Sequence, residues 1–176
     1  MTRVIRKSAA QSAAEALDLL GALFSAELVR PSKCLWLVSP WISDVEIIDN
    51  TAGTYPALAR YGRRPARLAE VLGTLAGPST RIVIGTTSDQ HNRAFLRRLD
   101  LLASDRGVAE FIDVHQDATR ALHTKALTGD DYALVGSMNI TYNGINLRDE
   151  YVQLETDEQY VARARMDVHG QFGGIL

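Results

Sequence analysis

The chain has 176 residues, of which 46% are hydrophobic and 23% are charged, the balance of an ordinary globular domain. This composition excludes collagen-like, low-complexity and largely disordered chains. The formal net charge of −2 excludes a strongly basic protein that coats nucleic acid, although it allows a local basic patch. The one cysteine, Cys34, excludes an intramolecular disulfide and fits a reducing compartment.

The sequence predicts a cytoplasmic protein with no membrane partner. Arg3, Arg6 and Lys7 precede an alanine-rich stretch, as in a signal peptide, but Gln11 and Glu15 interrupt the apolar run. No other apolar run approaches the ~20 residues of a membrane span.

The first elements alternate between helix and strand. Apolar residues recur at steps of three and four over 9–29 and predict an amphipathic helix, which Pro31 ends. The apolar run 34–38 is typical of a buried strand. Residues 45–65 are rich in turn residues, and we expect a loop or a loosely ordered excursion there.

The middle of the chain continues the alternation. Residues 66–76 favour a helix and 81–85 a strand. Asp89 can cap a helix over 90–104, and the alternating residues 110–114 indicate a further strand.

The last third predicts a hairpin, a strand and a closing helix. We expect the hairpin arms at 121–128 and 132–136, the strand at 151–154 and the helix at 157–172. No internal repeat divides the chain. The order of elements therefore predicts one α/β domain over 1–176, a central mixed β-sheet flanked by helices on both faces.

The hairpin carries residues that suit a phosphate. His123 and Lys125 are two apart, so on a strand their side chains share one face. Ser137 and Asn139 are again two apart beyond the turn. Ammonium, hydroxyl and amide donors around one imidazole match an anionic tetrahedral group. Glu150 begins the next strand, close enough to hold the second nitrogen of a histidine.

The lysine of this set is unusual in its own chain, which has 16 arginines and three lysines, Lys7, Lys33 and Lys125. The alternative interpretation is a solvent-exposed strand on which the His-x-Lys pair is incidental.

These residues form a spaced pattern of histidine, lysine, aspartate, glycine, serine and asparagine: His123, Lys125, Asp130, Gly136, Ser137 and Asn139. The pattern resembles the HKD signature of the phospholipase D superfamily, and the resemblance covers 35–155. The segment 35–44 is similar to that family's strand ending in Ser-Pro and an aromatic residue. Glu150 stands where the family's bacterial nucleases place an active-site glutamate. The resemblance implies a phospholipase D-like fold.

The spacing from Asp130 to Gly136 is one residue shorter than is usual in that family. A shorter hairpin arm changes the strand register. Asp130 or Asp131 can therefore take the family's aspartate role.

The resemblance also implies a two-step phosphodiester cleavage. One histidine attacks phosphorus to form a phosphohistidine, and a second protonates the leaving oxygen and later activates water. Lys125 and Asn139 orient the non-bridging oxygens, so we expect no metal and no other cofactor. Because the chain has one motif, the second histidine must come from a second copy, and we expect a homodimer with a composite site.

The remaining histidines, His91, His115 and His169, show no metal-ligand spacing. We expect them at the surface or at helix ends.

Two aromatic residues and three arginines are candidates for substrate binding. Trp41 and Tyr142 lie next to predicted strand ends and can stack on bases. The alternative places Trp41 in the core and Tyr142 at the edge of a dimer. Arg60, Arg63 and Arg64 can grip a nucleic-acid backbone or form a solvated face with acidic partners.

The leading hypothesis is a phospholipase D-like hydrolase, an endonuclease that cleaves DNA or RNA. A second hypothesis is a subunit of little activity that binds phosphate or nucleic acid, and a third is a phospholipase. Phospholipases of the family usually carry two motifs in a longer chain. A more distant resemblance is to the phospholipase-D-like component of bacterial 7-deazaguanine DNA-modification clusters. It implies partners among the other proteins of a DNA-modification or defence system.

Overall fold

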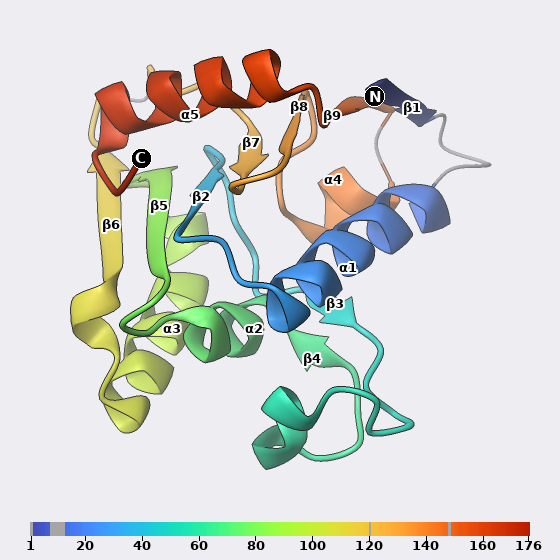
Figure 1. The fold of residues 1–176 in the computed structure, drawn as a ribbon, viewed down its shortest axis with the longest axis vertical. Coiled ribbons are helices and arrows are strands. Elements are labelled where there is room, and N and C mark those ends of the chain that lie inside the picture. The colour runs from blue at the N-terminus through green and yellow to red at the C-terminus, as the bar shows by residue number, and fades with distance from the viewer. Residues whose placement is uncertain (1, 8–12, 120, 148) are drawn as a thin grey trace.

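A seven-stranded mixed sheet with the strand order β1-β9-β8-β7-β2-β5-β6 is the centre of the fold in the computed structural model, which describes residues 2–7, 13–119, 121–147 and 149–176 (Figure 1). Strands β2, β5 and β6 are parallel, and the remaining neighbours in the sheet pair antiparallel. The strands of the sheet are β1 (Thr2–Lys7), β2 (Cys34–Val38), β5 (Arg81–Thr87), β6 (Ile112–Asp117), β7 (Ala126–Thr128), β8 (Ala133–Gly136) and β9 (Glu150–Glu155).

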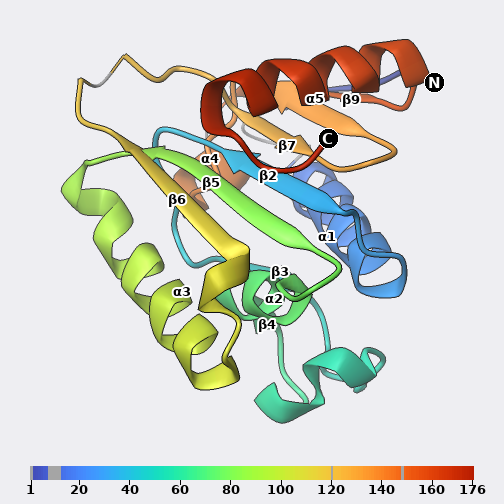
Figure 2. The same ribbon diagram turned by 60° about the vertical axis from the view of Figure 1, so that its left-hand side comes forward.

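Helices cover both faces of this sheet, as the sequence predicts. Figure 2 shows α5 on one side and α1, α2 and α3 on the other, and α4 packs against α1. The helices are α1 (Ala13–Val29), α2 (Leu68–Leu75), α3 (Arg93–Arg106), α4 (Tyr142–Asn146) and α5 (Glu158–Phe172). Among the described residues, no helix is both long and apolar enough to cross a membrane.

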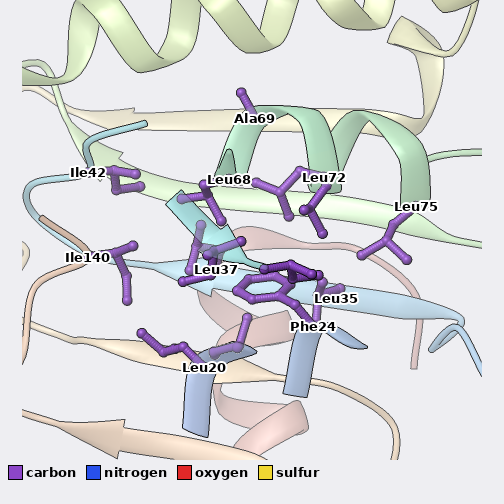
Figure 3. Close-up of a cluster of buried hydrophobic side chains, with 14 of the residues drawn as sticks. Leu20, Phe24, Leu35, Leu37, Ile42, Leu68, Ala69, Leu72, Leu75 and Ile140 are labelled. Atoms are coloured by element: carbon purple, nitrogen blue, oxygen red, sulfur yellow. The ribbon is translucent and has the colours of Figure 1, made fainter. Parts of the chain in front are cut away.

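Strand β2 shows why an unbroken apolar run forms the centre of the sheet. All five of its residues are fully buried, and alternate side chains face opposite layers. Leu35 and Leu37 pack with Phe24 of α1 and with α2 (Figure 3), whereas Trp36 packs beneath α5 with Phe172. A strand that is buried on both faces has a continuous run of apolar residues instead of an alternating pattern. Such a run can be recognised in the sequence.

The excursion 45–65 is more ordered than the sequence predicts. It begins with β3 (Glu46–Ile48), which pairs with β4 (Ala66–Arg67), and it contains the 3₁₀ helix η1 (Pro56–Tyr61). Ile47, Ile48 and Leu58 are buried. These few apolar side chains anchor the segment in spite of its many turn residues.

Other boundaries differ from the prediction by a few residues. Asp89 caps the short 3₁₀ helix η2 (Gln90–Asn92), and α3 follows it. A further 3₁₀ turn, η3 (Ala109–Phe111), occupies the expected start of the strand that becomes β6. Residues 9–12 of the expected first helix lie outside the described residues. Residues 13–29 of that helix form α1.

Strand β1 was not expected from the sequence. It pairs antiparallel with β9, with Ile5 opposite Val152. Ile5 is buried while Val4 is exposed, because only one face of this edge strand packs on the core. Ile5 is the one buried side chain among those described in β1 (residues 2–5), and a single buried residue gives a weak alternation signal.

Candidate active site

The register of the sheet gathers most of the motif, but not Asp130, at one edge, where the parallel strands β2, β5 and β6 end. Strand β7 runs antiparallel to β2, with Val38 opposite Ala126. Strand β8 returns beside β7 with Ala126 opposite Val135, and β9 follows with Gly136 opposite Val152. The start of β7, the end of β8 and the start of β9 therefore meet at the carboxyl edge of the parallel strands, the edge at which open α/β sheets bind ligands.

Ser137 is held between β8 and β9 at this edge. Its amide donates to the carbonyl oxygen of Tyr151 at 2.9 Å, and its hydroxyl accepts a hydrogen bond from the Tyr151 amide, also at 2.9 Å. The hydroxyl proton is donated to the Glu150 carboxylate. The carboxylate that we expected beside His123 therefore holds Ser137 in this structure.

Asn139 is positioned by Ser39, which follows the end of β2. The Ser39 hydroxyl lies 3.1 Å from the amide oxygen of Asn139, 2.8 Å from the Trp41 carbonyl oxygen and 3.4 Å from the Ile140 amide nitrogen. Asn139 is buried, and its oxygen faces Ser39. The donor end of its amide is thus the end left to meet an anion.

His123 and Lys125 precede β7 rather than lying on it, so the expectation that they share one face of a strand is wrong. Residues 121–125 are irregular, and β7 begins at Ala126. Pro40 follows β2 and cannot donate to a strand ladder, so β2 does not continue beside them. His123 is exposed, and the Lys125 ammonium donates to the His123 carbonyl oxygen at 2.6 Å.

Asp117, at the end of β6, orders the segment that leads to His123. Its carboxylate accepts hydrogen bonds from the Thr119 hydroxyl at 2.6 Å, the Thr119 amide at 2.8 Å and the Leu122 amide at 2.8 Å. These bonds, the Thr119 hydroxyl first, lower the pKa of Asp117 below its usual value. Leu122 is buried under α5. The Asp-x-Thr sequence, typical of an Asx turn, is the signal that sequence analysis passed over.

Asp130 lies at the opposite end of β7 from Lys125, in the turn to β8. Its carboxylate accepts a hydrogen bond from the Lys33 amide at 2.9 Å and forms an ion pair at 3.0 Å with Arg165 of α5. Asp131 pairs with the exposed Arg30 at 3.3 Å. The structure brings neither aspartate to the edge that carries Ser137, so the expected place of Asp130 in the reacting group does not fit its position.

The surroundings of Asp130 predict a structural role that can be measured. The side chains of Asp130 and Arg165 are 25% and 19% exposed, so Asp130→Ala removes a half-buried ion pair and a backbone hydrogen bond. We expect a loss of about 1–3 kcal/mol in the free energy of unfolding, measured by urea denaturation. Asp131→Ala, which removes an exposed pair, should cost less than about 1 kcal/mol. An unchanged stability with lost activity would contradict this role.

Trp41 and Tyr142 lie beside Asn139, where the structure forms a cavity of ≈ 410 Å³. Trp41 is 42% exposed and Tyr142 is 63% exposed, so the alternative of a core Trp41 is wrong. Ser43 and His91 line the same cavity, and His91 lies at the surface in η2, as expected. The two aromatic side chains are therefore open to a ligand at the motif edge.

The arginines of the excursion are not brought to this edge. Arg60 pairs with Asp105 near the end of α3 at 2.6 Å, and Arg64 pairs with the buried Glu70 at 2.6 Å. Burial would raise the pKa of Glu70, but hydrogen bonds from Arg64 and its neighbours lower it. Arg63 lies in the same excursion and is exposed. Arg60 and Arg64 therefore match the alternative expectation, in which the arginines pair with acidic residues of the protein.

The chain resembles known proteins in its three-dimensional structure. No protein-family model and no curated protein matches the sequence. NucT from Helicobacter pylori superposes with a TM-score of 0.56 over 99% of this chain and 100% of its own, at 12% identity. Nuc from Salmonella typhimurium, a phospholipase D family member, gives 0.58 over 97% of this chain and 92% of its own, also at 12% identity.

The chain has the phospholipase D fold. A polyphosphate kinase from Porphyromonas gingivalis also matches, with a TM-score of 0.62 at 9% identity, over 96% of this chain and 25% of its own. The phospholipase D fold therefore supports several phosphate chemistries, and the activity has to be argued from the side chains at the edge. Among the described residues, no three histidine, cysteine, aspartate or glutamate side chains gather to hold a metal ion.

Proposed function

We propose that the chain is a phosphodiesterase of the phospholipase D superfamily, an endonuclease that cleaves DNA or RNA through a covalent phosphohistidine at His123. The observation that carries the proposal is the convergence of the His123 segment, Ser137, Asn139 and Glu150 on one edge of the sheet. It is supported by the full-length likeness of fold to two nucleases.

The first step is attack by a ring nitrogen of His123 on phosphorus. A nitrogen–phosphorus bond forms, the bond to the leaving oxygen breaks, and that oxygen takes a proton from a second histidine. The exposed imidazole of His123 can approach a phosphate without moving a covering element. In the second step, water attacks phosphorus, gives its proton to the second histidine and releases His123.

Lys125 and Asn139 stabilise the charge that builds on the non-bridging oxygens. The Lys125 ammonium already reaches the backbone at His123, so exchanging that carbonyl for a phosphate oxygen needs only a side-chain rotation. The Asn139 amide is held in place by Ser39, so its donor end is fixed before the substrate binds. Fixed donors aimed at developing charge are the largest single contribution in many enzymes.

The second histidine is supplied by the partner subunit's His123 in a two-fold dimer. One chain carries one His-Lys-Asn set, and the reaction needs a nucleophile and an acid on opposite sides of phosphorus. Two large apolar side chains that are exposed near the edge, Leu147 and Tyr151, support a contact with a second copy there. A two-fold axis at this edge brings two identical sets to one phosphate.

The proposed chemistry predicts cleavage that survives a chelator. Lys125 and Asn139 supply the positive charge and the donors for which other nucleases use a metal. We expect labelled DNA or RNA to be cut at a rate that changes less than about twofold in millimolar EDTA. Activity that vanishes with EDTA and returns with Mg²⁺ would contradict the mechanism. Cleavage of lipid with none of nucleic acid would favour a phospholipase.

A further inference from the structure

The cavity beside Asn139 has walls that are fixed before any ligand binds. Asn92, almost fully buried, donates from its amide to the Pro40 carbonyl oxygen at 2.9 Å and accepts from the Ile42 amide at 2.8 Å. Thr87 donates to the same Pro40 carbonyl at 2.7 Å. These bonds hold the backbone on both sides of Trp41, so its exposed ring is presented on a rigid loop.

The same loop is tied directly to the motif. Ile42 forms a parallel bridge with Ile140, and the Ser43 amide donates to the Ile140 carbonyl oxygen at 2.8 Å. The Ser43 hydroxyl is hydrogen-bonded to Nε2 of His91 at 2.9 Å. Because Ile140 follows Asn139 directly, these contacts fix Trp41 and the Ser43–His91 pair in position relative to Asn139.

The described lining of the cavity favours a neutral occupant over a phosphate. Its described lining includes the Asp89 carboxylate, which caps the turn at His91, and contains neither lysine nor arginine. Two exposed aromatic rings, with no lysine or arginine in the described lining, favour a flat neutral group. The volume of ≈ 410 Å³ falls in the range of about 300–1,000 Å³ that is typical of small-molecule sites.

We infer that this cavity binds one unpaired nucleobase next to the scissile phosphate, stacked on Trp41 and Tyr142, with the Ser43–His91 pair facing the edge of the base. The inference rests on the proposed function, because Asn139 lines the cavity and its amide is also the proposed donor to the scissile phosphate. A base that enters the cavity cannot remain paired in a duplex. The substrate class is therefore single-stranded nucleic acid or a strand with an unpaired nucleotide.

Equilibrium binding tests the inference without any cleavage. The chain has two tryptophans, and Trp36 is fully buried, so a ligand that stacks on Trp41 quenches the fluorescence of a single exposed tryptophan. We expect His123→Asn protein to be quenched by a single-stranded oligonucleotide and not by the same backbone carrying abasic residues. Equal quenching by both strands, or by neither, would overturn the inference. The result does not depend on whether the protein is a nuclease.

Cleavage kinetics give the second arm. We expect Trp41→Ala to raise KM for the single strand about tenfold with little change in kcat, and Trp41→Phe to restore it. On the abasic strand, wild type and Trp41→Ala should be alike. Tyr160→Ala, an exposed aromatic residue on α5, is the matched control and should change neither substrate. A Trp41→Ala protein that sediments as a monomer, or that loses kcat on both strands, would instead assign Trp41 to the dimer.

Discussion

His123→Asn abolishes phosphodiester cleavage, with an expected loss in kcat of about 10³-fold or more. Asparagine keeps the polarity of the side chain but has no nitrogen that can form the covalent bond to phosphorus. In the proposed dimer the same change also removes the acid that the partner subunit needs. The measurement is single-turnover cleavage of a labelled oligonucleotide, with the fold checked by circular dichroism.

His115→Asn is the matched control for this result. His115 is also exposed, but it lies on β6 at the far edge of the sheet and contacts the ring of Phe172. It should leave kcat within about twofold of wild type, as surface changes away from a site usually do. Near-normal turnover of His123→Asn would show that another group is the nucleophile.

Excess His123→Asn chains poison wild-type chains when the two are mixed. If each site needs one histidine from each of two subunits, a mixed dimer is inactive. At a ninefold excess with random pairing, activity per wild-type chain should fall about tenfold. Dimers are exchanged by dilution and reassembly, and differently tagged chains confirm that mixing has occurred.

The same excess of Asp131→Ala chains is the control, because Asp131 lies away from the motif edge in an exposed ion pair. Those chains should not lower activity per wild-type chain. Constant activity per wild-type chain with excess His123→Asn, after exchange is shown, would mean that each chain acts alone.

The sequence predicts an element well where both of its faces are buried. The run 34–38 is apolar on both faces, and the structure buries all of it in β2. The turn between His123 and Ser137 also predicted that the chain folds back on itself here, and β7 and β8 do pair antiparallel, which brings the segments before β7 and after β8 to the same edge.

The details that failed depend on partners distant in the chain. Whether 121–125 continues a strand is decided by Pro40, more than 80 residues earlier, where β2 stops. The support of Asn139 by Ser39 spans 100 residues, and no local pattern records it. Arg60 looked free to bind nucleic acid because Asp105 lies 45 residues away on another helix.

The central claim is that cleavage passes through a covalent bond between His123 and phosphorus. The most direct measurement is the stereochemical outcome at phosphorus, using an oligonucleotide with one phosphorothioate of defined configuration and isotopically labelled water. Two successive in-line displacements, first by His123 and then by water, predict net retention of configuration. Net inversion would show that water attacks the substrate directly, and it would contradict the account.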